Sequence, residues 1–445
     1  MSPKPKFQAI KGTRDLLPPE TELWNRVEET ARAVFGTFGF GEIRVPVFEP
    51  TELFARAVGG ETDIVSKEMY TFSDQPQEKT ESGPSSAATR HSPLATSVSL
   101  RPEATASVCR AYIEHNMNQW PQPVKLYYMG PMFRRERPQK GRYRQFYQIG
   151  AEVLGGTDAP AIDAEVIEMV MTFFSRLGLK GVQLNVNSIG CRNCRPQYVE
   201  LLRAELQKVK DKLGADSQRR IDTNPLRVLD SKLESEQPII EKLPRIGVHL
   251  CAECAAHYAA VKRQLELRGV LYRENWRLVR GLDYYMRTTF EITAAGLGSQ
   301  NAVCGGGRYD GLVELLGGPP TKGIGFAIGE DRLILSLQES GKEPVAQGRD
   351  VYIAWMGEHA HATAIRAAKD LRNAGFRVEL PPVEQKFGKA LGHADKLGAK
   401  FALILGDNEV SSGEWTLKTL ADGSQQKFTE PQLLEFLRKQ TTVSS

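Results

Sequence analysis

A pair of adjacent segments with two-residue periodicity most constrains how this chain can fold. Residues 123–135 and 143–154 are predicted to be strands joined by a polar turn. Neighbouring strand residues point to opposite faces, so Gln148, Gly150 and Glu152 share one face and an apolar set shares the other. A buried amide and a buried carboxylate need polar partners. This face therefore suits a small polar ligand better than a core, and a solvent-facing strand is the alternative.

The turn between these strands is strongly basic. It carries six Lys or Arg side chains among the eleven residues from Arg134 to Arg144. Guanidinium groups bind phosphates through paired hydrogen bonds. The turn could therefore bind a nucleotide, an RNA backbone or both. A solvated hairpin tip is the alternative.

Two further peptides carry candidate binding groups. LRPEATA (100–106) places Glu103 and Thr105 after a short strand, and a carboxylate can accept hydrogen bonds from an α-ammonium group. RGLDYY, within a predicted strand from 276 to 295, puts Arg280 before two tyrosines. The arginine could neutralise a phosphate or carboxylate, and a tyrosine hydroxyl could bind an imidazole nitrogen. Aromatic side chains on a strand are more often core residues.

Two glycine-rich peptides follow. CGGGRYD (304–310) is predicted to be a triple-glycine turn, because consecutive glycines allow sharp bends or close backbone approach to a ligand. It matches neither a P-loop nor a dinucleotide-binding fingerprint. GIGFAIGEDRL (323–333) is predicted to be a strand followed by a helix, with Arg332 in the first turn. A cation there opposes the helix dipole, which indicates a role in anion or nucleotide binding.

Four of the six cysteines form two Cys-x-x-Cys pairs. They are Cys191 with Cys194, and Cys251 with Cys254. The spacing within each pair is typical of a four-cysteine zinc site. The long separation between the pairs requires tertiary folding to unite them. Four ordinary thiols are the alternative, and the sequence leaves both open.

The order of the predicted elements indicates an α+β chain with two parts. Strands outnumber helical crossovers in residues 1–340, which favours an antiparallel sheet with helices on one face. Within this part, 74–98 is predicted to be a flexible inserted loop, rich in Ser, Thr and Pro, and about 188–275 a mainly helical insertion. Residues 341–348 are the predicted linker. Residues 349–445 alternate strand and helix, which predicts a small α/β domain.

Length and composition limit the class of protein. A chain of 445 residues exceeds one ordinary core, and 41% apolar with 25% charged residues is typical of a soluble globular protein. No run of about eighteen apolar residues occurs, so we expect no membrane span and no membrane partner. The first twenty residues lack a signal peptide's apolar core. With few cysteines for its size, the chain is expected in the cytoplasm.

Several long peptides resemble one family in order along the chain. FRRERPQKGRYRQFYQIGAE is similar to motif 2 of class II aminoacyl-tRNA synthetases in its histidyl form, and GIGFAIGEDRL to motif 3. RGLDYYMRTTFE and CGGGRYDGLVELLGG resemble two peptides peculiar to histidyl-tRNA synthetases. The region 20–50 resembles motif 1, which builds a dimer interface. The resemblance covers nearly the whole chain and implies a class II antiparallel sheet with a C-terminal anticodon-binding domain.

The resemblance implies an activity and its partners. Histidine would be activated by ATP as histidyl-adenylate, with release of pyrophosphate, and then transferred to the 3′ end of tRNA(His). Magnesium should accompany the ATP phosphates, and motif 1 implies a homodimer. Catalysis would rest on positioning and on electrostatic stabilisation of the transition state. The resemblance does not decide whether zinc binds the cysteines.

The resemblance also implies roles for particular residues. Arg134 and Arg280 would be catalytic, with Arg280 standing where other class II enzymes place a magnesium ion. The ATP-binding residues would be Arg134, Glu136 and Arg332. The histidine-binding residues would be Glu103, Ala104, Thr105, Tyr143, Gln148, Glu152, Tyr284 and Tyr285. The residues facing the tRNA acceptor end would be Arg137, Gln139, Lys140, Arg142 and Arg144.

The chain departs from the family pattern at three places. Ala104 stands where the family commonly has Gly, and Tyr147 stands where His is frequent, on the opposite strand face from Gln148. The insertion 74–98 directly precedes the Glu103 segment. We expect the added methyl group of Ala104 to be tolerated. The order of the insertion could influence how the pocket closes.

Two alternatives remain at the level of sequence. A paralogue of these synthetases is a histidine-binding regulatory subunit of ATP phosphoribosyltransferase, but such paralogues usually lack the C-terminal domain and have eroded histidyl peptides. A class II synthetase for another amino acid is the second. The pairing of RGLDYY with Glu152 favours an imidazole, because a carboxylate and a hydroxyl complement its two nitrogens.

Overall fold

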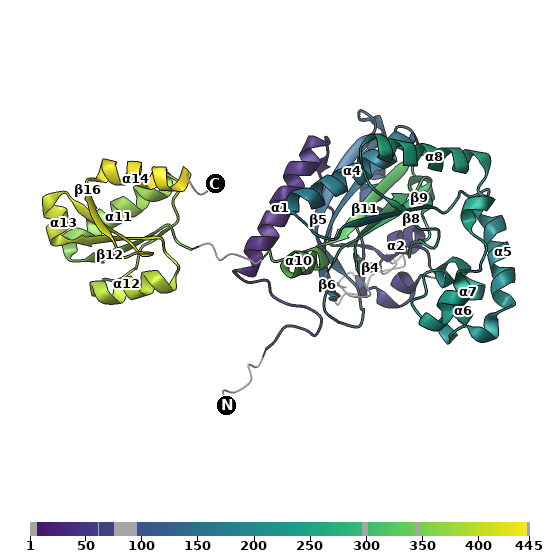
Figure 1. The fold of residues 1–445 in the computed structure, drawn as a ribbon, viewed down its shortest axis with the longest axis horizontal. Helices are drawn as coiled ribbons and strands as arrows, with labels where there is room; N and C mark the ends of the chain where they lie inside the picture. The colour runs from purple at the N-terminus through teal and green to yellow at the C-terminus, as the bar shows by residue number, and fades with distance from the viewer. Residues whose placement is uncertain (1–6, 61, 75–95, 296–300, 343–347, 443–445) are drawn as a thin grey trace, which may run out of the picture. The chain divides into compact units, whose positions relative to one another are not determined.

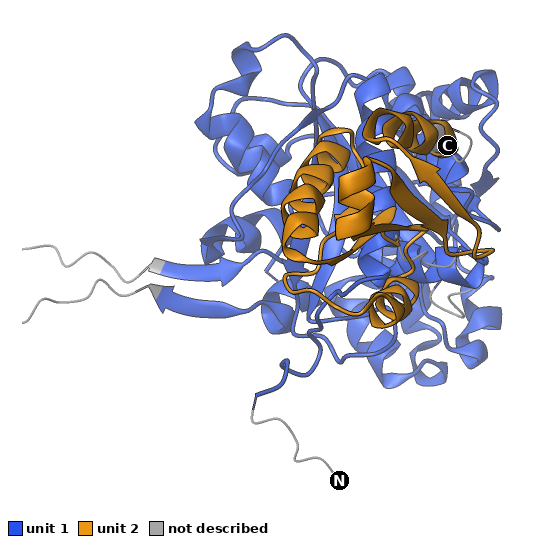
Figure 2. Ribbon diagram, turned by 90° about the vertical axis from the view of Figure 1, so that its left-hand side faces the viewer, with its two compact units in different colours: residues 1–344 blue, residues 345–445 orange. Residues whose placement is uncertain are grey.

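The computed structural model divides the chain into two compact units, residues 1–344 and 345–445 (Figure 2). The residues that it describes are 7–60, 62–74, 96–295, 301–342 and 348–442. Most of the predicted loop 74–98 and five residues of the predicted linker 341–348 lie outside the described residues. The ends of that loop belong to strands, since Asp74 ends one strand and Thr96 begins the next.

An eight-stranded sheet forms the centre of the first unit. Its order is β1-β5-β6-β11-β10-β9-β7-β8. All neighbours are antiparallel except the two edge pairs, β1 with β5 and β7 with β8. The strands are β1 Gly41–Glu42, β5 Val124–Phe133, β6 Gln145–Leu154, β7 Gln183–Ser188, β8 Arg273–Glu274, β9 Met286–Thr293, β10 Ala302–Arg308 and β11 Gly323–Gly329. The predicted antiparallel sheet is confirmed.

Four helices cover one face of this sheet, as Figure 1 shows for α1, α4 and α8. They are α1 Glu20–Thr37, α4 Pro160–Leu177, α8 Ala252–Leu267 and α10 Glu330–Glu339. The α1 helix buries an apolar stripe, and its Phe35 meets the rings of Tyr127, Phe173 and Phe326 edge-on at 5.6, 5.7 and 5.9 Å between centroids. Burying one such side chain contributes roughly 1.5–3 kcal/mol, so this contact ties two helices to the sheet.

The opposite face carries shorter elements. Helices α2 Thr51–Val58, α3 Thr105–Glu114 and α9 Leu312–Leu315 pack there with a three-stranded sheet in the order β2-β4-β3, formed by Phe48–Pro50, Thr96–Leu100 and Thr71–Asp74. Helices therefore flank both faces, whereas the sequence had indicated one. Pro46 lies between β1 and β2, and these two strands join different sheets, each at an edge.

The insertion forms a group of short helices at one end of the unit, on the right of Figure 1. These are α5 Arg195–Gln207, α6 Ala215–Thr223 and α7 Gln237–Ile240, with 3-10 turns at Lys210–Lys212, Pro225–Val228, Glu234–Glu236 and Ile246–His249. They share an apolar cluster that includes Tyr198, Leu202 and Ile221. The α8 helix, within the predicted 188–275, instead packs on the central sheet through Val261 and Leu265.

The second unit has its own sheet and core. Its strand order is β13-β12-β14-β15-β16. The strands are β12 Val351–Met356, β13 Val378–Glu379, β14 Phe401–Gly406, β15 Trp415–Thr419 and β16 Gln425–Phe428, and the helices are α11 Glu358–Asn373, α12 Phe387–Lys396, α13 Asp407–Ser412 and α14 Glu430–Thr442. Ile353, Leu403 and Ala364 lie fully buried between them. The alternation predicted from residue 349 onward is confirmed.

Two predicted elements were wrong. The strand expected from residue 276 begins only at Met286, so residues 280–285 form a loop. Gly305 and its two following glycines lie inside β10 rather than in a turn. A Cβ on Gly305 would lie 2.1 Å from the Arg280 guanidinium, and one on Gly306 would lie 2.4 Å from the Gly325 carbonyl oxygen. The glycines permit close approach across the sheet, not a bend.

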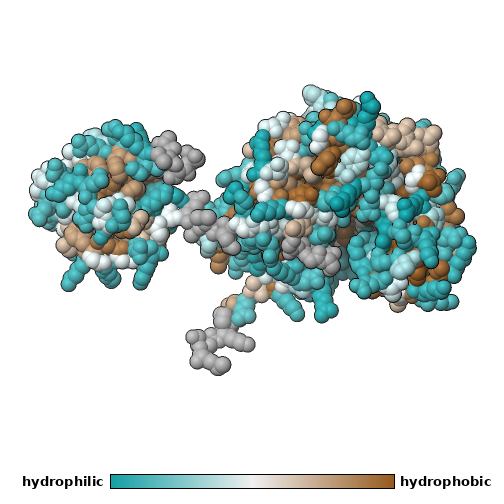
Figure 3. All heavy atoms as spheres, in the orientation of Figure 1, coloured by the Kyte–Doolittle hydropathy of each residue, from teal (hydrophilic) through white to brown (hydrophobic). Residues whose placement is uncertain are grey.

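Hydrophilic side chains cover most of the face shown in Figure 3. Apolar residues on that face lie in separate patches between them. Across the described part of the chain, no helix combines the length and the apolar character needed to cross a bilayer.

Candidate active site

A cavity of about 440 Å³ lies where the β5–β6 hairpin, the loop before β9 and the start of α10 meet. Seven of the residues singled out from the sequence line it, namely Arg134, Glu136, Arg142, Tyr143, Gln148, Arg280 and Arg332. The β6 face predicted from the two-residue pattern is confirmed. Ile149, Ala151 and Val153 enter the apolar core, while Gln148 points to the cavity.

Three arginines in the cavity are held by neighbouring groups. Arg134 donates from Nε to the Pro102 carbonyl oxygen at 3.0 Å and lies over the Phe146 ring. Arg332 donates to the carbonyl oxygens of Gly141 and Ala302, at 3.3 and 3.0 Å. Carbonyl acceptors orient a guanidinium without neutralising it. Arg134 also lies 3.8 Å from a Glu136 carboxylate oxygen. Both guanidinium groups line the cavity, where they can bind an anionic ligand.

Arg280 has a different setting. Its Nη1 lies 3.4 Å from a Glu291 carboxylate oxygen, and its guanidinium lies over the Tyr285 ring at 5.7 Å. Glu291 pairs with Gly305 across β9 and β10, so the glycine leaves space for the arginine. The side chain is thereby fixed in the cavity wall between the other arginines and the tyrosines.

A buried carboxylate lies behind Gln148 on the same strand. Glu152 is 1% exposed. It accepts hydrogen bonds from the Tyr309 hydroxyl at 2.5 Å and the Thr105 hydroxyl at 2.8 Å. Burial raises its pKa to about 8. A Cβ on Gly325 would lie 1.7 Å from the carboxylate, so glycine is needed on the adjacent strand.

Glu103 is hydrogen-bonded to the backbone at the start of a helix. Its carboxylate accepts the backbone N–H groups of Thr105 and Ala106, at 2.8 and 3.0 Å, at the start of α3. Burial raises the pKa of this carboxyl group. Ala104 is fully buried in the apolar cluster around α3 and does not line the cavity. The expected contact of Glu103 with a substrate amine stays a prediction.

Tyr284 and Tyr285 connect the arginine wall to the buried carboxylate. Their rings lie 4.7 Å apart, and Tyr284 lies 5.7 Å from Tyr309, which contacts Glu152. Burial raises the pKa of both hydroxyl groups, so they stay protonated donors. The loop 280–285 and strand β6 thus converge.

Three residues in this region were missed. Tyr309 stands in the CGGGRYD peptide, beside the glycines that drew attention to it. Glu291 has no distinguishing signal in the sequence. Asp331 lines the cavity and accepts the backbone N–H of Tyr147 at 3.0 Å and a hydrogen bond from Arg14 at 3.2 Å. Only its position next to Arg332 could have suggested it.

Comparison with known proteins identifies the family. Residues 92–333 match the family model described as histidyl-tRNA synthetase, and residues 350–440 match the anticodon binding domain. A histidine–tRNA ligase of Solibacter usitatus is 53% identical over 428 residues, covering 96% of this chain and 98% of that protein. The chain belongs to the histidyl-tRNA synthetase family.

Solved structures of the family agree with this membership. Apo histidyl-tRNA synthetase of Staphylococcus aureus matches with a TM-score of 0.77 and 36% identity, covering 97% of this chain and 99% of that one. A Bacillus halodurans protein described as an ATP phosphoribosyltransferase regulatory subunit/histidyl-tRNA synthetase matches at 19% identity and a TM-score of 0.60, covering 91% and 99%. At that identity the second match shows the fold alone. The class II fold expected from the motifs is confirmed.

The remaining residues of the basic hairpin do not line the cavity. Arg137, Gln139 and Lys140 are exposed at the tip, and Lys140 lies 3.3 Å from a Glu339 oxygen. Arg144 donates from Nε to the Glu136 carbonyl oxygen at 3.4 Å. The hairpin therefore presents one group of cations to the cavity and another to solvent.

The four cysteines of the paired motifs come together at the base of the insertion. The Sγ atoms of Cys191, Cys194, Cys251 and Cys254 all lie within 4.8 Å of one another. Burial raises the pKa of the Cys191 thiol, but hydrogen bonds from the backbone N–H groups of Cys194 and Asn193 outweigh this effect. The net result is a pKa lowered to about 6. A thiolate favours metal coordination. Cys109 and Cys304 are buried outside this cluster, and Cys304 lines the cavity.

Proposed function

We propose that this chain is a histidine–tRNA ligase that activates L-histidine with ATP and transfers it to tRNA(His). The observation that carries the proposal is the buried Glu152, with Tyr309 and Thr105 bound to it, next to an arginine-lined cavity. The Glu152 carboxyl group and the tyrosine hydroxyls complement the two nitrogens of an imidazole. The adjoining arginines suit a triphosphate. Family membership supports the same activity.

The first half-reaction joins the two parts of the site. The histidine carboxylate attacks the α-phosphate of ATP, an acyl-phosphate bond forms, and pyrophosphate leaves in-line. Arg134 would bind the α-phosphate, Arg280 would stabilise the charge that develops on it, and Arg332 would bind the far end of the nucleotide. Such fixed cations lower the barrier without reorganising during the reaction. Gln148 would position the amino acid, with Glu103 and Thr105 at its amino group.

Magnesium would accompany the nucleotide. The carboxylates of Glu136, Asp230 and Glu291 line the cavity, and carboxylate oxygens are the ligands that magnesium prefers. The ion would neutralise charge on the leaving pyrophosphate.

The second half-reaction needs tRNA. The residues facing the acceptor end would be Arg137, Gln139, Lys140, Arg142 and Arg144, because cations gathered on a hairpin tip attract phosphate. The C-terminal unit matches the anticodon binding domain and would bind the anticodon. We propose a homodimer through the region 20–50. All six cysteines are free thiols, which fits the reducing cytoplasm.

We also propose a structural zinc ion at the four cysteines. Tetrahedral zinc with Zn–S bonds of about 2.3 Å separates its sulfur ligands by about 3.8 Å. The Cys191 sulfur lies 3.7 Å from that of Cys194 and 3.9 Å from that of Cys251. Metal analysis of protein purified without chelators tests this. Less than about a tenth of an equivalent of zinc would refute it.

A histidine-binding regulatory subunit is the second candidate, since the Bacillus halodurans match shares the fold. The present chain has the anticodon binding domain and an intact Arg280–Tyr285 peptide, which favours the ligase. The deciding experiment is ATP–pyrophosphate exchange with each amino acid in turn. We expect exchange with histidine alone. Folded protein that binds histidine but supports no exchange would favour the regulator, and exchange with another amino acid would contradict the assigned specificity.

A further inference from the structure

The cysteine cluster and the tyrosine peptide are joined by backbone hydrogen bonds. The Ile189 N–H donates to the Arg287 carbonyl oxygen at 2.9 Å, and the Arg287 N–H donates to the Gly190 carbonyl oxygen at 2.7 Å. Gly190 directly precedes Cys191, and Arg287 follows Tyr285 by two residues. The chain therefore enters the cysteine cluster and leaves the tyrosine peptide at the same point.

A second connection comes from the far end of the first cysteine pair. Arg195 follows Cys194 and begins α5, and its Nη1 donates to the Tyr285 carbonyl oxygen at 2.5 Å. The Arg195 N–H in turn donates to the Cys191 carbonyl oxygen at 3.0 Å. Both ends of the Cys191–Cys194 loop thus contact the segment that follows Tyr284.

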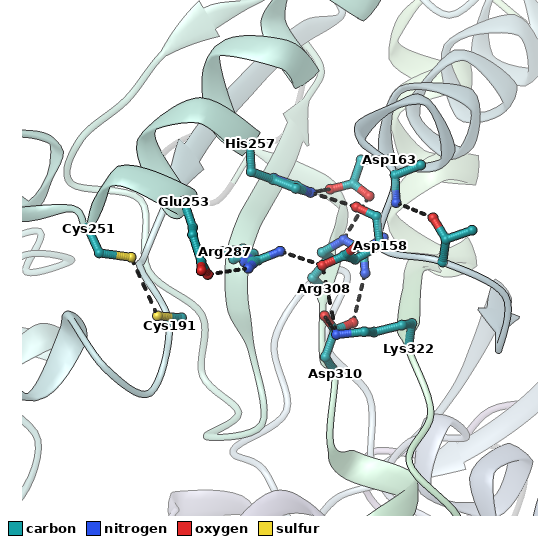
Figure 4. A network of polar contacts seen from close by, with 12 residues as sticks. Asp158, Asp163, Cys191, Cys251, Glu253, His257, Arg287, Arg308, Asp310 and Lys322 are labelled. Atoms are coloured by element: carbon teal, nitrogen blue, oxygen red, sulfur yellow. Dashed lines mark hydrogen bonds and ion pairs between the residues drawn. The ribbon is translucent and has the colours of Figure 1, made fainter.

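The second cysteine pair contacts the same segment through side chains. Met286 packs against Cys191, Cys194 and Cys254. Arg287 extends between Asp158, at 2.7 Å, and Glu253, at 3.6 Å, and Glu253 lies between Cys251 and Cys254 in the sequence. Figure 4 shows this arginine reaching from the cysteine side toward Asp158, with Arg308 and Asp310 beyond it.

The backbone at Arg287 is in the left-handed region, with φ of 50°. A residue with a Cβ rarely adopts this conformation, so surrounding contacts must hold it. The contacts that do so are the two backbone hydrogen bonds to residues 189 and 190 and the two carboxylates. The turn that follows Tyr285 is therefore determined by groups beside the cysteines.

We infer that a zinc ion held by Cys191, Cys194, Cys251 and Cys254 positions the Tyr284–Tyr285 peptide for histidine binding, with Arg195 as the positioning residue. The metal closes the Cys191–Cys194 loop, and this loop holds the carbonyl of Tyr285 and the backbone of Arg287. This inference rests on the proposed function, because it assigns the tyrosines to histidine.

A purely structural role for the metal predicts a different result. If zinc only stabilised the insertion, weakening the contacts between the cysteine cluster and the tyrosine peptide would change the affinities for histidine and for ATP to the same extent. If zinc positions the tyrosines, the same change lowers the affinity for histidine and leaves the affinity for ATP unchanged. The reason is that Arg134 and Arg332 are held by the carbonyl groups of residues 102, 141 and 302, which do not belong to the cysteine cluster.

The first experiment compares two variants of one helix. Arg195→Met removes the hydrogen bond to Tyr285, whereas Arg203→Met removes a comparable bond on α5, from Nε to the Ile221 carbonyl oxygen at 3.2 Å. Zinc content, histidine affinity by calorimetry and the KM values for histidine and ATP are measured on the same preparations. We expect both variants to keep about one equivalent of zinc. Arg195→Met should raise the Kd and KM for histidine about tenfold, the value of one charged hydrogen bond, and leave the KM for ATP within about twofold. Arg203→Met should change neither.

The second experiment removes the metal ligand. Cys251→Ser should lose zinc and weaken histidine binding by at least as much as Arg195→Met, while Cys109→Ser, outside the cluster, should retain both. Equal losses for histidine and ATP, or unchanged histidine affinity in Arg195→Met, would overturn the inference. If Cys251→Ser fails to fold, the Arg195 pair still decides. Wild-type protein that binds histidine without pyrophosphate exchange would refute the proposed function, while calorimetry would still test the positioning role.

Discussion

The two halves of the site are built differently. On the proposed histidine side, Glu152, Tyr309 and Thr105 are buried and hydrogen-bonded to one another. On the proposed nucleotide side, Arg134 and Arg332 line an open cavity and are oriented by carbonyl groups. One half is closed and desolvated, and the other is charged and accessible.

This difference separates specificity from binding strength. A buried site that hydrogen-bonds one particular group rejects ligands that lack this group, because binding such a ligand leaves the site's own polar groups buried without partners. A triphosphate needs charge more than shape, and fixed guanidinium groups supply it. Substitutions in the two halves should therefore have different kinetic signatures.

The largest effect is expected in the closed half. Glu152→Ala should reduce kcat/KM for histidine in pyrophosphate exchange by about 10³-fold or more, because it removes a desolvated partner and strands the Tyr309 and Thr105 hydroxyl groups. The KM for ATP should change little. Glu152→Gln, which keeps the shape, serves as the control for packing. Normal histidine activation by the alanine variant would show that the buried carboxylate does not bind the imidazole.

A smaller effect is expected where the halves meet. Arg280→Ala should slow adenylate formation by about 10²- to 10³-fold, with a far smaller change in ATP affinity, because the charge it stabilises exists mainly in the transition state. Single-turnover kinetics and ATP binding measure the two separately. Arg277→Ala is the matched control, since Arg277 donates to Leu229 and Gln237 instead. Equal losses in rate and ATP binding would contradict the catalytic role.

The smallest effect concerns the pH dependence of stability. The Glu152 pKa is about 8 in the folded chain, well above its ordinary value near 4.5. Between these values the unfolded state ionises and the folded state does not, so this contribution is full below pH about 4.5 and is lost as pH rises through about 8. The free energy of unfolding falls by about 1.4 kcal/mol per pH unit in this range, which corresponds to a fall in Tm of roughly 2 °C per pH unit.

Melting curves of wild type and Glu152→Gln measure this contribution directly. The Tm of wild type should fall relative to that of Glu152→Gln as the pH rises from 5.5 to 8, while the titrations of all other groups, which the two proteins share, cancel. A constant difference over that range would show that the carboxyl group is not held protonated by burial.

Some of this site could be predicted from local sequence. The side-chain alternation in β6 placed Gln148 and Glu152 correctly, because strand geometry has a period of two and needs no tertiary information. The glycines of residues 305–307 suggested close approach, and this was right, but the bend was wrong. Local sequence cannot tell whether a glycine run serves a turn or a neighbour, because here the neighbour is Arg280.

Other features depended on contacts between distant segments. Tyr309 and Glu152 are 157 residues apart along the chain, and no local pattern marks their pairing. Glu103 was expected to face a substrate amine, yet its oxygens also hold the start of α3. Which of a carboxylate's possible partners it meets depends on the packing around it.

The sequence by itself determined the family, the strand faces and the residue types available for chemistry, because motifs and periodicity are local properties of the chain. Only the tertiary structure decided which of those groups meet. It buried Glu152, brought two Cys-x-x-Cys pairs to within 4.8 Å, and joined them to the tyrosine peptide through Arg195 and Arg287. The physical reason is that burial and long-range hydrogen bonding depend on how the whole chain packs.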